Sequence, residues 1–172
     1  GSSEQRAAAV AQFNEIKPTI VAVMNESFSD LSCFEQLQAA GYTGPAFYSS
    51  LPDTLVRGTM LASVAGGGTA NSEFEFLTGA TTAFVGVGKI PYQLYQMNDV
   101  NSLAKDLKEL GYTATAMHPQ NPVNYHRDKI YQQLGFGDFL SIADFEGAPY
   151  YHAGVCDYAT YDKILDLLRT SI

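Results

Sequence analysis

The spacing of apolar residues changes along the chain, and each change predicts an element. Residues 19–24 (TIVAVM) and 112–117 are compact runs that predict strands covered on both faces, as in an α/β sheet. Helical spacing covers residues 7–16, 31–40, 69–77, 101–110, 127–134 and 158–168, and the mixed stretch 47–59 predicts short strands. Leu103, Leu107 and Leu110 share one face of their helix. Strands that alternate with helices predict an α/β fold with a mostly parallel central sheet flanked by helices.

Composition narrows the classes of function. The chain has 172 residues, of which 46% are hydrophobic and 16% charged, so it can build a core. The formal net charge of -8 repels a nucleic acid backbone, and we expect no nucleic-acid binding. Cys33 and Cys156 lie outside any C-x-x-C motif, and two free thiols are favoured over a disulfide, which spacing cannot establish. No apolar run is long enough to cross a membrane.

Glu26 is the first candidate for chemistry because it directly follows the strand predicted at residues 19–24. Ligands of open α/β sheets gather at the carboxyl ends of strands, where a carboxylate can bind a cation or act as a base. The alternative is a solvated glutamate or one that caps a helix. The local sequence does not separate these two interpretations.

Thr69 is the second candidate, because it follows three glycines and begins a predicted helix. Glycines let the backbone approach a ligand, and a helix N-terminus favours an anion. A threonine there can attack phosphorus once its proton is removed. The alternative is that Thr69 is an ordinary N-cap. The stretch is not a P-loop, since no Gly-Lys-Ser/Thr follows the glycines.

The third candidate is the stretch after the strand at residues 112–117. His118 ends that strand, and Tyr125, His126 and Arg127 follow a polar loop. An arginine, two histidines and an aromatic residue near a strand end can hold a phosphate that carries a small polar group. The alternative is a surface loop in which Arg127 and Asp128 cap the next helix.

Taken in order, these stretches resemble one family. They look like the lipoteichoic acid synthase and phosphoglycerol transferase group of the sulfatase and alkaline phosphatase superfamily, from about Pro18 to Leu168. The resemblance implies that residues 1–17 are a tag remnant and lead-in, and that residues 18–172 are the N-terminal part of a sulfatase-like catalytic domain, incomplete at its C-terminus. The motifs are NESF at 25–28, TANSEF at 69–74, His118, YHRD at 125–128 and LGF at 134–136.

The resemblance also implies a divalent metal, Mn or Mg, bound by Glu26 and Thr69, with Thr69 as the nucleophile. It implies that His118 and Arg127 hold the glycerol phosphate group, beside Tyr125 in place of a common tryptophan. His126 and Gln120 depart from the family's frequent Asn and Asp, which leaves the substrate open. The family takes an Asp-His metal pair from a later segment that this chain lacks. We therefore expect the chain alone to be inactive and to bind metal weakly.

The function implied is transfer of glycerol phosphate from a phosphatidylglycerol-like lipid, through a phosphothreonine, to a polymer or glycan acceptor. The resemblance places the catalytic domain outside a bacterial cell, attached to its membrane. A phosphoethanolamine transferase or a phosphodiesterase would use the same threonine as nucleophile, so both remain alternatives. A non-catalytic domain that binds glycerol phosphate is a third alternative. Sulfate ester hydrolysis is disfavoured, because neither Cys33 nor Cys156 lies in a C-x-P/A-x-R context.

Overall fold

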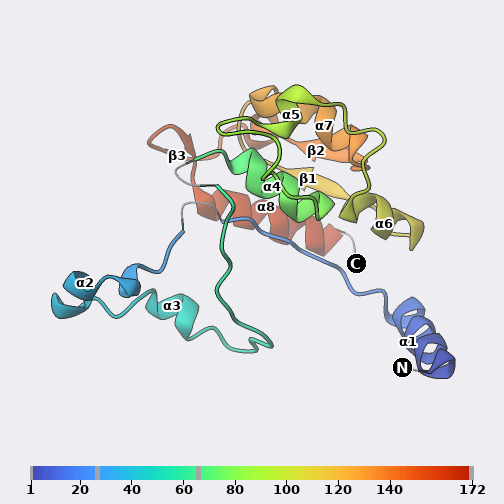
Figure 1. Ribbon diagram of the computed structural model, residues 1–172, viewed down its shortest axis with the longest axis horizontal. Helices are drawn as coiled ribbons and strands as arrows, with labels where there is room; N and C mark the ends of the chain where they lie inside the picture. The colour runs from blue at the N-terminus through green and yellow to red at the C-terminus, as the bar shows by residue number, and fades with distance from the viewer. Residues whose placement is uncertain (1, 26–27, 65–66, 171–172) are drawn as a thin grey trace. The chain divides into compact units, whose positions relative to one another are not determined.

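A computed structural model describes residues 2–25, 28–64 and 67–170 of the chain (Figure 1). The chain divides into two compact units, Gly1–Val56 and Arg57–Ile172, called unit 1 and unit 2 below. Each unit is described by itself.

Unit 1 consists of short helices joined by irregular backbone, and none of its described residues is buried. Two predicted helices are confirmed here, the second as two pieces separated at Phe34. The elements are α1 (Ser3–Ile16), the 3-10 helix η1 (Leu31–Cys33), α2 (Glu35–Ala39) and α3 (Ala46–Ser49).

The strand predicted at residues 19–24 is wrong for this structure. Those residues have no strand pairing and are exposed, with Ile20 and Val23 each 51% accessible. An isolated strand is not stable in water, because its backbone groups and apolar faces need neighbours. The described part of unit 1 contains no strand that could pair with it. The short strands predicted within residues 47–59 are also wrong, since α3 and irregular backbone take their place.

Unit 2 contains the buried core and most of the regular structure. The predicted helices at 69–77, 101–110, 127–134 and 158–168 are all confirmed, with shifted ends. The elements are α4 (Thr69–Thr78), α5 (Pro91–Leu94), α6 (Leu103–Glu109), β1 (Thr115–Met117), η2 (Asn124–His126), α7 (Arg127–Gln133), β2 (Asp138–Leu140), η3 (Ile142–Phe145), β3 (Tyr150–Tyr151), β4 (Gly154–Val155) and α8 (Asp157–Thr170).

The sheet of unit 2 is small and parallel. β1 pairs with β2 in the register Ala116↔Phe139, and α7 lies in the connection between them, which makes a βαβ unit. β3 and β4 form a separate antiparallel pair that the sequence pattern did not indicate. The predicted α/β class is therefore confirmed in part, as a mostly helical chain with a two-stranded parallel sheet.

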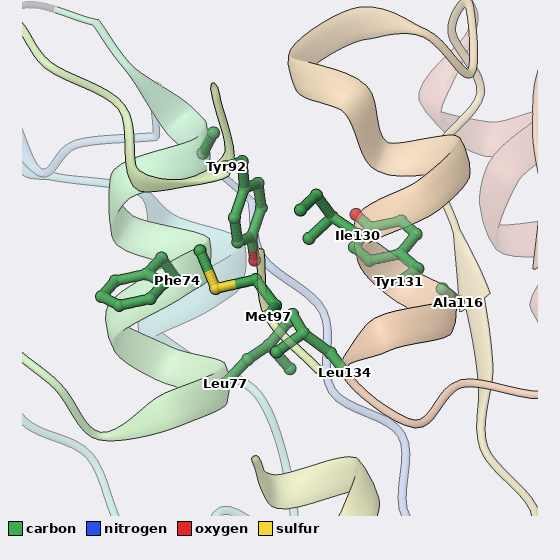
Figure 2. Packing of buried hydrophobic residues seen from close by; sticks show 9 residues of the cluster. Phe74, Leu77, Tyr92, Met97, Ala116, Ile130, Tyr131 and Leu134 are labelled. Atoms are coloured by element: carbon green, nitrogen blue, oxygen red, sulfur yellow. The ribbon is translucent and has the colours of Figure 1, made fainter. Parts of the chain in front are cut away.

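The core lies between α4 and α7. Figure 2 shows Phe74 and Leu77 of α4 on one side, Tyr131 of α7 on the other, and Tyr92 and Met97 between them. Tyr92 and Met97 are 2% and 1% exposed, so these side chains fill the space between the two helices. Burying large apolar side chains of this kind is the main source of folding free energy.

The apolar face predicted for α6 is not the face that packs. Leu103 and Leu110 are 39% and 50% exposed, whereas Ala104 is 3% exposed. The hydroxyl of Ser102 donates to the Leu134 carbonyl, which ties the start of α6 to the end of α7. Small side chains allow this close approach, and the larger leucines stay outside it.

Gly135 lies directly against Lys105 of α6, and its replacement tests this packing. Gly135 has φ +98°, and a Cβ there would lie 2.8 Å from Lys105 Cγ and 3.2 Å from the Lys105 nitrogen. We expect Gly135→Ala to lower the free energy of unfolding by about 2–4 kcal/mol, through backbone strain and overpacking. Gly147→Ala is the control, with φ +77° and open space around it. Equal losses of stability in urea unfolding would contradict the packing of α6 against Gly135.

Candidate active site at the start of α4

The start of α4 is built on a glycine turn. Gly67 and Gly68 have φ +107° and +85°, a region that side chains rarely adopt. Gly68 is the N-cap and provides no side-chain hydrogen bond, so Thr69 is the first residue of the helix. The interpretation of Thr69 as an N-cap is therefore wrong. The hydroxyl of Thr69 lies at the positive end of the helix dipole, where an anion is stabilised.

Glu73 lies one turn after Thr69 and faces the core. It shares the inner face of α4 with Ala70, Phe74 and Leu77, and it is 9% exposed. A carboxylate among apolar side chains is costly unless it is paired and hydrogen-bonded. The partner comes from α7: Arg127 donates to Glu73 Oε2 from Nε at 3.1 Å and from Nη2 at 3.0 Å.

Arg127 is buried at 1% exposure. Burial acts to lower its pKa, but the Glu73 carboxylate outweighs burial and holds the pKa above its ordinary value. The guanidinium carbon lies 5.1 Å from the centre of the Tyr125 ring, a cation–π contact. Arg127 is therefore charged and held on two sides, by a carboxylate and by an aromatic ring.

The turn before Arg127 is strained. Tyr125 and His126 have φ +55° and +60°, in the left-handed region that non-glycine residues rarely adopt. The His126 amide donates to the Val123 carbonyl at 2.9 Å, and the Asp128 amide donates to Pro122 at 2.9 Å. These two hydrogen bonds fix the turn before α7. The turn places Arg127, the first residue of α7, inside the protein. Such strain gathers at functional sites.

His118 directly follows β1, as the sequence predicts. Its amide donates to the Leu140 carbonyl at 2.9 Å, which extends the pairing of β1 with β2. Within the described residues, its Nδ1 atom is buried without a hydrogen-bond partner. Burial, and then the charge of Arg127, lower the pKa of His118 to about 4. The imidazole is therefore neutral at pH 7.

Two more side chains of α4 hold the loop that follows it. Asn71 Nδ2 donates to the Lys89 carbonyl at 3.0 Å. Glu75 Oε1 accepts from the amide and the hydroxyl of Thr82, each at 2.7 Å. These bonds, chiefly the one from the Thr82 amide, lower the pKa of Glu75 below its ordinary value. The loop is thus fixed at two points to the helix that begins at Thr69.

The structure brings some of the predicted site residues together. Arg127 contacts the Tyr125 ring, and its charge helps to lower the pKa of His118. Thr69 lies on the same helix as Glu73, and Glu73 forms the ion pair with Arg127. Glu26 lies outside the described residues. The roles assigned to these side chains stay predictions.

Within the described ranges, no group of three or more His, Cys, Asp or Glu side chains could hold a metal ion. The residues described do not make a complete metal site, and metal binding by Glu26 and Thr69 stays a prediction.

No helix in the described part of the chain is long and apolar enough to cross a membrane. Cys33 is an exposed free thiol of unit 1, and Cys156 is a partly buried free thiol of unit 2.

Sequence reasoning missed the pairing of Glu73 with Arg127. A signal was present, because Glu73 shares the 3.6-residue spacing of Ala70, Phe74 and Leu77 and so falls on the apolar face of α4. A buried acid requires a partner, and the chain contains few arginines to supply one. The interpretation of Arg127 as a residue of a surface loop is wrong, since its side chain is buried.

Comparisons with known proteins agree on one family. The sulfatase family profile matches residues 18–171, nearly the whole chain. A protein of Rhizobium meliloti (strain 1021), named for the modification of cyclic beta-1,2-glucan, is 35% identical over 125 residues. That match covers 73% of this chain and 19% of the relative.

The fold is similar to a solved structure. The lipoteichoic acid synthase LtaP from Listeria monocytogenes matches with a TM-score of 0.55 and 22% identity. The match covers 62% of this chain and 25% of that one. The chain thus spans about a quarter or less of the length of either protein it matches.

The buried ion pair predicts a large effect of removing one partner. We expect Glu73→Gln to lower the free energy of unfolding by about 3–5 kcal/mol, because it leaves Arg127 buried without a countercharge. The double variant Glu73→Leu/Arg127→Met should recover most of that loss. The control is Asp166→Asn, which breaks the exposed pair with Arg169 at 3.0 Å and should cost less than ~1 kcal/mol. Similar losses for Glu73→Gln and Asp166→Asn in urea unfolding would be inconsistent with a buried pair.

His118 predicts a pH dependence of stability. Between the ordinary pKa of 6.5 and the folded pKa of about 4, the unfolded chain binds a proton that the folded chain does not. Stability therefore falls as the pH is lowered through this window. Allowing for the partial exposure of the ring, we expect a loss of about 1–2 kcal/mol. His118→Gln should flatten the curve measured from pH 7 to pH 4.5, whereas the exposed His152→Gln should not. An unchanged slope in His118→Gln would refute the assignment.

Proposed function

Because the chain belongs to the sulfatase family, we propose that it carries the nucleophile of a phosphoglycerol transferase, and that the nucleophile is Thr69. One observation carries the proposal. Thr69 is the first residue of a helix whose N-cap is a glycine, and the same helix is fixed by the buried pair of Glu73 and Arg127. A hydroxyl at such a helix start meets a phosphate where backbone amides and the helix dipole favour negative charge.

The proposed reaction has two steps. In the first, a bond forms between Thr69 Oγ and the phosphorus of a phosphatidylglycerol-like donor, and the bond from phosphorus to the diacylglycerol oxygen breaks. The proton lost by Thr69 is balanced by the proton that diacylglycerol gains. In the second, the acceptor oxygen bonds to the phosphorus of the glycerophosphothreonine, and the bond from phosphorus to the Thr69 oxygen breaks. The proton lost by the acceptor hydroxyl is balanced by the proton that Thr69 recovers.

The site must above all stabilise the negative charge of the phosphate group. The N-terminus of α4 would stabilise the non-bridging oxygens, and Arg127 would add a positive charge. Glu73 engages Nε and Nη2 of Arg127, and Arg127 is 1% exposed, so it would act on the phosphate chiefly through its positive charge. His118 and Tyr125 would bind the glycerol part, with neutral His118 Nδ1 as a hydrogen-bonding atom.

A divalent cation, Mn²⁺ or Mg²⁺, belongs to the proposal through Glu26 and Thr69. When bound, such an ion lowers the pKa of a coordinated hydroxyl and neutralises phosphate charge. The described residues do not complete a site for it, so the steps above are assigned to the chain's own residues.

The acceptor and the location are proposed from the relatives. The Rhizobium meliloti protein is named for the modification of a cyclic glucan, which supports a glycan acceptor. LtaP is a lipoteichoic acid synthase by name, which supports a glycerol phosphate polymer and a lipid donor. We propose that the site works outside a bacterial cell, beside the membrane that holds its donor.

A phosphoethanolamine donor is the second candidate. His126 and Gln120 differ from the residues frequent in the phosphoglycerol transferases the chain resembles, and His126 lies in the strained turn before Arg127. Comparing diacylglycerol release from phosphatidylglycerol and from phosphatidylethanolamine distinguishes the two donors. Faster release from phosphatidylethanolamine would replace the first candidate by the second.

Thr69→Ala tests the nucleophile. In the full-length protein supplied with Mn²⁺, we expect release of diacylglycerol from phosphatidylglycerol to fall at least ~10³-fold, because no covalent intermediate can form. The matched control is Thr78→Ala, at the other end of α4, where the hydroxyl donates to the Phe74 carbonyl at 2.7 Å and accepts from the Ala80 amide at 3.2 Å. Thr78→Ala should retain activity. Retained turnover in Thr69→Ala would refute the proposal.

A further inference from the structure

We propose that the loop at residues 79–90, between α4 and α5, contacts a lipid surface and inserts Phe84 and Val87 into it. The proposal rests on the proposed function in one respect, which is that the donor is a lipid. It adds a surface of the protein that would meet the membrane beside the reacting hydroxyl. Figure 1 shows the loop leaving the end of α4 and returning to α5 within unit 2.

The loop carries two apolar side chains that contact almost nothing. Phe84 is 93% exposed and Val87 is 104% exposed. Single exposed apolar residues are ordinary on protein surfaces, but two on one loop tip are a candidate contact. The glycines on either side of Val87 have φ +101° and +70°, so the backbone here is a tight turn. The turn presents both side chains outside the core.

The loop is held by the helix that carries Thr69. Glu75 accepts two hydrogen bonds from Thr82 before the apolar pair, and Asn71 donates to the Lys89 carbonyl after it. The exposed tip is therefore not an unattached loop, because both of its ends are fixed to α4. A lipid held at the tip would lie at a set position relative to the start of α4.

Charge and size favour a lipid surface over a protein partner. The chain's net charge of -8 repels anionic headgroups in general, but the only charged residue at positions 79–90 is Lys89, so this loop is locally positive. A lysine beside exposed apolar side chains matches an anionic headgroup layer above acyl chains. A stable protein interface needs roughly 800 Å² on each partner, more than one such tip supplies. A bilayer interface accepts single apolar side chains.

The sequence offers a clean probe, because the chain contains no tryptophan. Phe84→Trp places a single fluorophore at the tip. The chain would be mixed with vesicles of phosphatidylglycerol and phosphatidylcholine in equal amounts. We expect a blue shift of the emission, and quenching by lipids that carry bromine on their acyl chains. The control is Tyr158→Trp on α8, where the native residue is 59% exposed, and it should show neither effect.

A second substitution tests the mechanism of insertion. Adding Val87→Asp to Phe84→Trp should weaken the vesicle partition coefficient about tenfold or more, because a carboxylate must then enter the apolar layer. Circular dichroism spectra and melting curves that match the unsubstituted chain confirm that each variant is folded. No blue shift in folded Phe84→Trp, equal shifts at positions 84 and 158, or no effect of Val87→Asp would each overturn the proposal.

The outcome is separate from that of the transfer reaction. Insertion of Phe84→Trp without any phosphoglycerol transfer would leave the lipid-contacting loop standing and remove the proposed donor chemistry. Transfer by the full-length protein that is equal for a membrane-embedded donor and a short-chain soluble donor, and unchanged by Phe84→Ser, would overturn the loop proposal alone.

Discussion

The buried ion pair of Glu73 and Arg127 is the interaction on which the arrangement of unit 2 depends. It joins α4 to α7 across the core, and neither charge is tolerable there without the other. Because Thr69 begins α4 and Arg127 begins α7, the pair fixes the starts of two helices relative to each other. Apolar packing alone would allow small shifts between the helices, whereas a bidentate hydrogen-bonded pair sets direction as well as distance.

The surrounding groups are consistent with that constraint. Tyr92 and Tyr131 are buried, and burial followed by the Glu73 carboxylate raises the pKa of each well above its ordinary value. Both therefore stay neutral, as does His118, so the pair is the main charge in the core. The same helix α4 also holds the loop at residues 79–90 through Asn71 and Glu75. One helix thereby connects the proposed nucleophile, the buried charge and the proposed lipid contact.

The sequence predicted the elements that local signals determine. The helix at α4 followed from its glycines, α7 from its apolar spacing and Gly135, and β1 from a short β-branched run. The prediction of a strand at residues 19–24 was wrong, because a strand depends on neighbouring strands, and the local spacing of apolar residues does not indicate whether these exist. The prediction of the packing face of α6 was wrong, because the small side chain of Ala104 lets α6 approach the end of α7 more closely than the leucines would. Glu73 was missed because pairing is a contact between residues 54 positions apart. The stretches that carry the candidate site were predictable from motif order, and their connection through Glu73 was not.

The central claim is that Thr69 forms a covalent bond to phosphorus, and peptide mass spectrometry tests it most directly. The full-length protein would be incubated with phosphatidylglycerol and Mn²⁺ without acceptor, quenched in acid and digested. The account predicts a glycerophosphate adduct on Thr69, absent when a chelator is present. Transfer that proceeds with no adduct on this peptide, or with the adduct on Ser72 instead, would contradict it.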